Sequence, residues 1–318
     1  MHYSVALIIV LSAWAYPKIS LASEFREMML LKVDKSTLQA ELRTWPEDAS
    51  QSRSLHRFRI AIGKAQGDKE REGDNKTPEG IYFTQAVIED PGVPQKYGPR
   101  AIPLNFPNPI DKLFGKTGHG IWLHGAGDDQ RIEASNVTEG CVAFYNADIL
   151  RLTNWLKPFQ AGIVISTDME KINQADDVQA VMLATKAWAQ AWAQRNTSQY
   201  LDFYHSSFEH NKMNRQAYGE YKSKVFTSYK EIEVKIDQIR IASHPKYAVA
   251  IMNQDFRGDR RFSAIGRKLL YWQKQNDGKW AIAREIYEDR RFEPLQYSEA
   301  EVLALSKTAQ ETGRQVSR

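Results

Sequence analysis

Short apolar runs separated by turn residues dominate the first half of the chain. The runs are 30–33, 58–62, 81–83, 120–124 and 162–166. Glycine and proline punctuate the segments between them, as in Thr77-Pro78-Glu79-Gly80 and Tyr97-Gly98-Pro99. Short strands bounded by such turns are typical of β-sandwiches and barrels. We therefore predict a mainly β domain over residues 23–168, with one short amphipathic helix near 146–156.

The second half changes first to a helical period and then to long strand-like segments. Apolar and aromatic residues recur on one helical face from Val178 to Trp192, a stripe that more often forms core than a ligand site. Four strand-like segments follow at 232–241, 247–252, 262–272 and 280–286. Asn276-Asp277-Gly278 between the last two is a strong hairpin signal. Helices followed by an antiparallel meander predict an α+β domain.

The boundaries of this second domain follow from composition. A polar stretch at 169–177 is interpreted as the linker, which places the α+β domain at 178–295. Residues 296–318 form a tail in which 298–301 predict the start of a last short helix.

The amino-terminal residues predict export. Residues 5–16 are apolar but too few to span a bilayer, and Ser20-Leu21-Ala22 has the small-x-small form of a cleavage site. We interpret 1–22 as a signal peptide and expect a periplasmic protein without a membrane span in its mature form.

Length and charge narrow the classes of protein further. A chain of 318 residues exceeds a usual single domain, which agrees with two folded units. The formal net charge is +4, from 43 basic and 39 acidic residues. Nucleic-acid binding calls for a clustered basic face, and this near balance gives no sign of one.

Cys141 is the only cysteine, so no intramolecular disulfide can form. A lone thiol in an exported protein is either buried and inert or chemically used. It follows glycine in Thr138-Glu139-Gly140-Cys141, and His124-Gly125 lies upstream at the end of an apolar run. Glycine beside a nucleophile lets a substrate carbonyl approach, and an imidazole is a common activator of a thiol. The amides of residues 140 and 141 are candidates for stabilising an oxyanion.

This pattern resembles the L,D-transpeptidase (YkuD-type) family, which carries His-Gly followed at similar spacing by Ser/Thr-x-Gly-Cys. The resemblance covers roughly residues 30–168 and includes further landmarks. These landmarks are 63–64, 67–70, 73–74, 76–82, 96–99, 105–108 and 115–118. It implies an enzyme that acts on peptidoglycan stem peptides by acyl transfer at the bond between a diamino acid and D-alanine, without a metal or organic cofactor.

The resemblance also implies site residues. Cys141 would be the nucleophile and His124 the general base, with Gly125 and Gly140 as backbone parts of the catalytic site. The residues assigned to substrate binding are Tyr97, Asn105, Trp122, His119 and Thr138.

Two departures favour one branch of the family. Many members have His before the Gly-Cys pair and Arg two residues after the Cys, where this chain has Glu139 and Ala143. Arg100 or Arg131 is a candidate to replace the missing Arg. The pattern is similar to the helical-cell-shape L,D-carboxypeptidases, which carry a nuclear transport factor 2-like (NTF2-like) domain after the catalytic one.

Several alternatives stay open at the level of sequence. An L,D-transpeptidase would form cross-links or attach and detach proteins at the diamino acid, whereas a carboxypeptidase would trim tetrapeptides to tripeptides. A non-catalytic peptidoglycan-binding scaffold is a further alternative. The second domain is left open between binding a glycan, binding a protein and forming a homodimer. We also predict that residues up to about Asp168 fold without the second domain.

Overall fold

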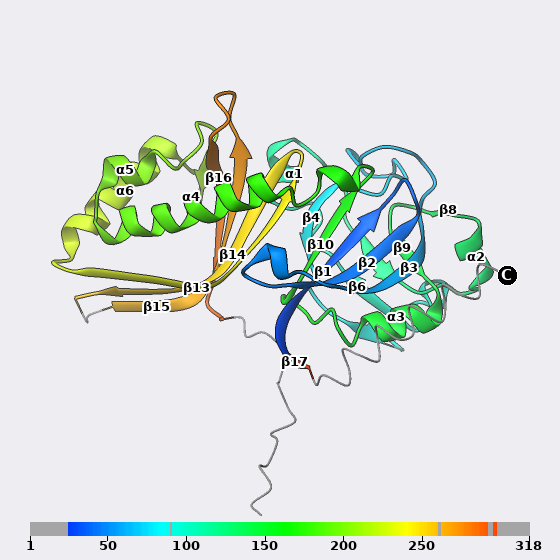
Figure 1. The fold of residues 1–318 in the computed structure, drawn as a ribbon. Coiled ribbons are helices and arrows are strands. Elements are labelled where there is room, and N and C mark those ends of the chain that lie inside the picture. The colour runs from blue at the N-terminus through cyan, green and yellow to red at the C-terminus, as the bar shows by residue number, and fades with distance from the viewer. Residues whose placement is uncertain (1–24, 90, 260–261, 292–294, 298–318) are drawn as a thin grey trace, which may run out of the picture.

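A computed structural model describes residues 25–89, 91–259, 262–291 and 295–297. The chain forms two domains that meet along a broad contact (Figure 1). The predicted signal peptide and the helix start expected at 298–301 lie outside the described residues. Within those residues, no helix combines the length and apolar character needed to cross a membrane.

The first domain consists mainly of strands. They are β1 (Phe25–Asp34), β2 (Gln39–Trp45), β3 (Ser54–Gly63), β4 (Gly80–Phe83), β5 (Ile88–Glu89), β6 (Arg100–Pro103), β7 (Trp122–His124), β8 (Asn136–Thr138), β9 (Val142–Phe144) and β10 (Ala161–Ser166). The helices are α1 (Pro109–Leu113), α2 (Gln130–Glu133) and α3 (Asn146–Leu152), with the 3-10 turns η1 (Ala49–Gln51), η2 (Gln95–Tyr97) and η3 (Met169–Lys171).

These strands form one curled sheet in the order β4-β10-β1-β2-β3-β9-β7-β6-β5, to which β8 adds beside β3. Most neighbours are antiparallel, but β1 with β10, β7 with β9, and β3 with β8 run parallel. The predicted apolar runs supply the core: Leu31, Ile60, Leu123 and Ile163 are fully buried in one cluster. The predicted mainly β first domain is confirmed, as a sheet curled into a half-barrel.

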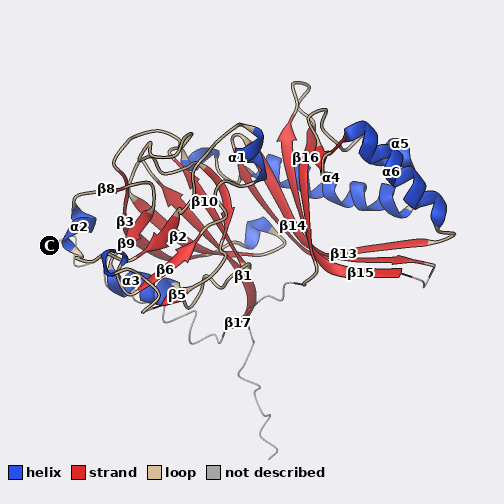
Figure 2. Cartoon of the chain, turned by 180° about the vertical axis from the view of Figure 1, so that it is seen from behind, coloured by secondary structure: helices blue, strands red, loops and turns tan. Residues whose placement is uncertain are grey.

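The second domain is α+β, as predicted. Its elements are α4 (Ala175–Ala193), α5 (Thr197–Leu201), β11 (Glu209–His210), β12 (Met213–Asn214), α6 (Arg215–Ser228), β13 (Ile232–His244), β14 (Tyr247–Gly258), β15 (Phe262–Lys274), β16 (Trp280–Glu288) and β17 (Leu295–Tyr297). The long strands form the meander β13-β14-β15-β16, and the helices lie against one face of it (Figures 1 and 2). Helix α4 begins inside the stretch interpreted as the linker. Strand β17 returns to the first domain and pairs with β1.

Aromatic side chains fill the space between these helices and the meander. Trp188 and Trp192, from the stripe seen in the sequence, are buried there beside Tyr200. Glu285 of β16 lies in the same interior and accepts a hydrogen bond from Tyr218 (2.7 Å) while pairing with Lys268 (3.2 Å). Burial opposes ionisation of Glu285, but the nearby lysines and the hydroxyl outweigh it and hold its pKa at about 2. The carboxylate therefore stays charged and ties α6 to β15 and β16.

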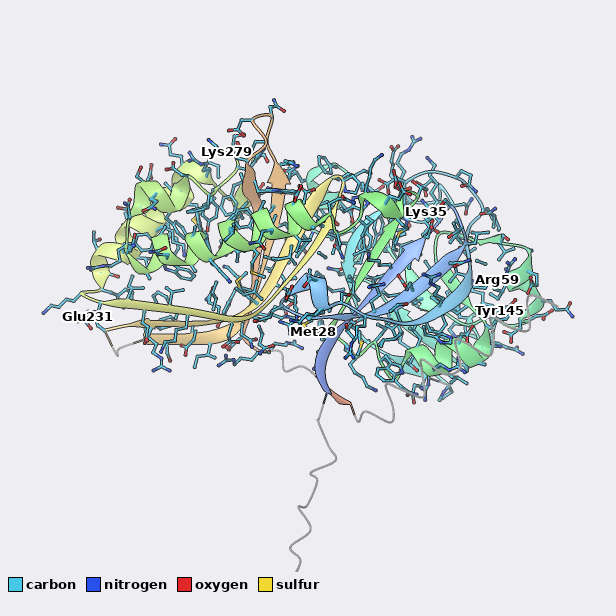
Figure 3. The ribbon with its side chains drawn as sticks, viewed as in Figure 1. Met28, Lys35, Arg59, Tyr145, Glu231 and Lys279 are labelled. Atoms are coloured by element: carbon cyan, nitrogen blue, oxygen red, sulfur yellow. The ribbon has the colours of Figure 1, made fainter. Side chains whose placement is uncertain are left out.

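The two domains share a hydrophobic cluster. Met28, at the junction in Figure 3, and Trp45 of the first domain are buried in it with Val249 and Leu269 of the second. Trp45 Nε1 also donates to the carbonyl of Ile241 (3.0 Å). A chain cut near residue 168 would expose this apolar surface to water. The interface therefore argues against the expectation that the first domain folds without the second.

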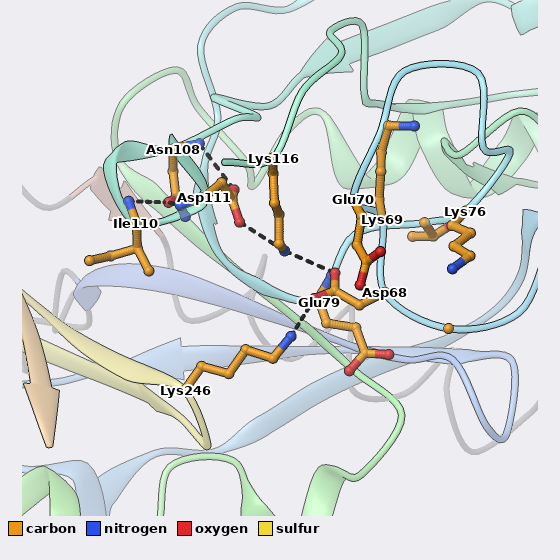
Figure 4. A network of polar contacts seen from close by, with 12 residues as sticks. Asp68, Lys69, Glu70, Lys76, Glu79, Asn108, Ile110, Asp111, Lys116 and Lys246 are labelled. Atoms are coloured by element: carbon orange, nitrogen blue, oxygen red, sulfur yellow. Dashed lines mark hydrogen bonds and ion pairs between the residues drawn. The ribbon is translucent and has the colours of Figure 1, made fainter. Parts of the chain in front are cut away.

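A polar network crosses the same junction (Figure 4). Lys246, at the turn between β13 and β14, pairs with Asp68 of the first domain. Lys116 lies between two acids, 3.0 Å from Asp68 and 3.0 Å from Asp111. Lys116 is largely buried; burial alone would lower its pKa, but the two carboxylates raise it. The segment around residue 68 is thus fixed from both domains.

Tyr247 closes the junction with its hydroxyl. This oxygen accepts from the Ile81 N–H (2.6 Å) and from Asn108 Nδ2 (2.7 Å), and it donates to the Ile81 carbonyl (3.1 Å). All these groups are buried. A phenyl ring would leave the Ile81 N–H without its acceptor, and Asn108 Nδ2 would keep only the Ile81 carbonyl, at 2.9 Å.

We expect Tyr247→Phe to lower the free energy of unfolding by about 1–3 kcal/mol, because the buried Ile81 N–H loses its acceptor and Asn108 Nδ2 loses one of its two. Urea denaturation followed by circular dichroism would measure the loss. Tyr221→Phe is the matched control, since Tyr221 is exposed on α6. Equal denaturation midpoints for Tyr247→Phe and wild type would contradict the role given to this hydroxyl.

Candidate active site

Parallel pairing of β7 with β9 brings the predicted catalytic residues together. Leu123 lies opposite Val142 and His124 opposite Ala143, so Cys141, just before β9, comes level with the start of β7, two positions from the histidine. Both side chains line one cavity of about 120 Å³. The full lining is Lys64, Lys96, Tyr97, His124, Gly125, Ala126, Arg131, Ile132, Val137, Thr138, Glu139, Cys141 and Ala143.

The turn before the nucleophile packs closely against the backbone and is fixed by hydrogen bonds from two threonines. Gly140 has φ +128°, and a Cβ there would lie 2.7 Å from the carbonyl oxygen of Lys76, so only glycine fits. The carbonyl of Cys141 accepts from Thr138 Oγ1 (2.7 Å) and, at 3.5 Å, from Thr77 Oγ1. Cys141 itself is only 9% exposed. Its position is therefore fixed by the tight turn at Gly140 and by the two threonine hydroxyls.

The imidazole of His124 is oriented by its neighbour along the chain. Nδ1 lies 2.5 Å from the carbonyl oxygen of Gly125, which favours the tautomer with the proton on Nδ1. The edge of the Tyr97 ring packs against the imidazole at 4.8 Å between centroids. Nε2 is buried and has no partner within the described residues. This nitrogen is thus left free to accept a proton.

Burial keeps both groups uncharged in the free protein. It raises the pKa of the Cys141 thiol to about 11, although the backbone amide of Trp122 and the charge of Lys96 favour the thiolate. It lowers the pKa of His124 to about 4; the Gly125 carbonyl opposes this, and the charges of Arg131 and Lys96 add to it. At neutral pH the pair is a thiol and a neutral imidazole, not an ion pair.

Asn146, which we did not single out from the sequence, clamps the loop after His124. Its Oδ1 accepts from the Ala126 N–H and its Nδ2 donates to the Ala126 carbonyl, each at 2.9 Å. The same oxygen would lie 2.3 Å from a Cβ on Gly125, which explains the glycine after the histidine. An asparagine at the start of a short helix gives no sequence signal for this role.

The residues assigned to substrate binding are placed in different surroundings. Tyr97 and Thr138 line the cavity, and the Trp122 ring packs against Tyr97 at 5.1 Å. His119 is exposed and pairs with Glu72 at 3.4 Å. Asn105 accepts from the Phe83 N–H (2.8 Å) and lines a second cavity of about 370 Å³ at the domain junction.

The two arginines considered as replacements for the missing one also differ. Arg131 of α2 lines the catalytic cavity. Arg100 does not; it pairs with Glu89 at 3.1 Å and donates to Thr153 Oγ1 at 2.7 Å. In the described part of the chain, no three His, Cys, Asp or Glu side chains converge as they would to hold a metal ion.

The chain matches two protein families. Residues 30–169 match the L,D-transpeptidase catalytic domain (YkuD), and residues 180–286 match the Cds6 C-terminal NTF2-like domain. No curated protein matches the chain by sequence.

Two solved structures resemble most of the chain. Bd1075 from Bdellovibrio bacteriovorus has 26% sequence identity and a TM-score of 0.70, covering 86% of this chain and 96% of that one. The helical cell shape determining protein Pgp2 from Campylobacter jejuni has 25% identity and a TM-score of 0.68, covering 84% of this chain and 94% of that one. The similarity to Pgp2 agrees with the branch expected from the sequence. The chain therefore contains an L,D-transpeptidase (YkuD-type) catalytic domain followed by an NTF2-like domain.

Proposed function

We propose that this protein is a periplasmic L,D-carboxypeptidase that trims peptidoglycan tetrapeptide stems to tripeptides. Cys141 is the nucleophile and His124 the general base. The observation that carries the proposal is the meeting, in one cavity, of a lone thiol with an imidazole whose buried Nε2 has no partner in the described part of the chain. A nucleophile and a base that share a cavity support acyl transfer.

The reaction would proceed in two steps. As Sγ bonds to the carbonyl carbon of the diamino acid, the thiol proton passes to His124 Nε2. The carbon–nitrogen bond to D-alanine then breaks, and the leaving amine takes that proton. Water adds to the thioester with His124 as base, the carbon–sulfur bond breaks, and the sulfur regains its proton.

The backbone next to Cys141 is the candidate oxyanion site. The Gly140 N–H already donates to Thr138 Oγ1 at 3.2 Å. Of the two amides proposed from the sequence, that of Cys141 is therefore better available to stabilise the tetrahedral intermediate. The Cys141 carbonyl, which belongs to the next peptide unit, accepts a hydrogen bond from Thr138 Oγ1 at 2.7 Å.

Two features favour water over a second stem as acceptor. The catalytic cavity is small, about 120 Å³, and a cross-linking enzyme needs an organised site for a second stem beside the nucleophile. Ala143 also leaves the cavity without the arginine that many cross-linking members have there. The similarity to a helical cell shape determining protein supports a role in cell shape.

We expect Cys141→Ala to lower turnover of tetrapeptide muropeptides at least about a thousandfold, because no covalent route remains. His124→Ala should lose nearly as much, since the pair acts as a unit. Both variants should keep the wild-type melting temperature. His205→Ala, a half-exposed histidine of the second domain, is the control and should stay within about twofold. An inactive His119→Ala beside an active His124→Ala would contradict the choice of base.

Alkylation of Cys141 should show that the resting pair is uncharged. Because the pKa of the thiol is about 11, its thiolate fraction grows tenfold per pH unit throughout the neutral range. We expect the iodoacetamide rate constant to rise continuously from pH 7 to pH 10, whereas a cysteine peptide levels off near pH 9. A plateau between pH 5 and pH 8 would indicate a thiolate–imidazolium pair instead.

Product analysis shows whether water or the amine of a second stem resolves the thioester. Mature protein incubated with purified tetrapeptide muropeptides should accumulate tripeptides and free D-alanine, measured by mass spectrometry. Dimers cross-linked between two diamino acids as the main product would establish a transpeptidase. No product, together with no labelling of Cys141 by a carbapenem, would favour the non-catalytic scaffold.

A further inference from the structure

The rim of the catalytic cavity carries an excess of positive charge. Lys64, Lys96 and Arg131 contribute cations, and Glu139 is the one acid in the lining. Lys64 faces Glu139 at 4.0 Å, so that pair largely cancels. The charges left over are those of Lys96 and Arg131.

Neither of these cations has a carboxylate partner among the described residues. Arg131 donates only to the Val137 carbonyl, at 3.3 Å, and Lys96 lies over the Tyr97 ring at 4.7 Å. Five other arginines of the first domain do lie beside a carboxylate: Arg43 and Arg57 share Glu41, while Arg59 pairs with Glu133, Arg100 with Glu89 and Arg151 with Asp148. A guanidinium left open at a cavity that holds a nucleophile is suited to receive a carboxylate.

Both cations lie close enough to the imidazole to influence it. They disfavour protonation of His124, which lies in the same cavity. An anion bound between them would offset this repulsion. The imidazolium that forms during attack on the carbonyl would then be less costly when a carboxylate is present than when it is absent.

We propose that Arg131, assisted by Lys96, binds the terminal carboxylate of the stem peptide and makes the enzyme selective for free carboxyl termini. This deepens the proposed function and rests on it. The carboxylate of the departing D-alanine is one residue from the scissile carbonyl, so a cation on the cavity rim can reach it while Cys141 attacks. An amide bond at that position would remove the charge that the guanidinium recognises.

The test compares two synthetic tetrapeptide substrates that differ only in a terminal carboxylate or carboxamide. Wild-type enzyme should have a kcat/KM at least about tenfold higher for the acid, since a charge-assisted pair is lost in the amide. Arg131→Ala should lower kcat/KM for the acid about 10- to 100-fold and change that for the amide less than about twofold. Arg131→Lys should recover part of the preference, and Lys96→Ala should show a smaller loss.

Arg57→Ala is the matched control, because Arg57 is an exposed arginine of the same domain outside the cavity. It should retain the wild-type preference. Equal kcat/KM for acid and amide in the wild type would overturn the anchor while leaving the proposed carboxypeptidase in place. An Arg131→Ala variant in which kcat/KM falls equally for the acid and the amide would also overturn the anchor while leaving the proposed carboxypeptidase in place. A wild type that processes neither substrate would overturn the proposed function and the anchor together.

A third substrate distinguishes binding of the terminal carboxylate from binding of the carboxylate on the side chain of the diamino acid. Amidation at the side-chain centre of the diamino acid should leave the effect of Arg131→Ala unchanged. If Arg131→Ala instead has no effect on kcat/KM for this amide but still lowers it for the terminal amide, Arg131 binds the carboxylate of the diamino acid and the proposal is wrong.

Discussion

The parallel pairing of β7 with β9 is the constraint on which the catalytic site depends. Two neighbouring parallel strands cannot be joined by a tight turn, so the chain must leave the sheet after His124 and cross over before Cys141. That crossover contains α2 and β8, which supply Arg131, Ile132, Val137 and Thr138 to the cavity. The spacing between histidine and cysteine, which first pointed to the family, is thus also the length of chain that builds the cavity wall.

The second domain has a structural part in this arrangement. Its contact with the first domain combines a shared apolar cluster, the Tyr247 hydroxyl and the pairing of Lys246 with Asp68. Asp68 in turn accepts from the Glu79 N–H, two residues after the threonine that contacts the Cys141 carbonyl. The junction therefore continues, through a short piece of chain, to the support of the nucleophile. The two domains are better regarded as one folded unit than as an enzyme with an attached module.

Local patterns in the sequence predicted most of the elements, because periodicity and turn chemistry act over a few residues. Residues 58–62 lie in β3, Asn276-Asp277-Gly278 joins β15 to β16, and the tryptophan stripe is the buried face of α4. Contacts between distant residues could not be predicted in this way. Tyr247 meets Ile81 across 166 positions, and only the folded chain shows that Arg131 lines the cavity while Arg100 is neutralised by Glu89. The hydrogen bonds of Asn146 to the loop after His124 could not be predicted for the same reason.

The pairing of β1 with β17 has a consequence for the order in which the molecule can assemble. Strand β1 is the first described element along the chain, yet its partners β10 and β17 begin at residues 161 and 295. During synthesis, β1 emerges long before either partner, and only β2 is available to it early. Contacts so distant along the chain slow folding and prolong the exposure of unpaired strand edges. The completed sheet must therefore wait for the last described residues, and an interrupted or prematurely cleaved chain would be left with an open edge prone to aggregation.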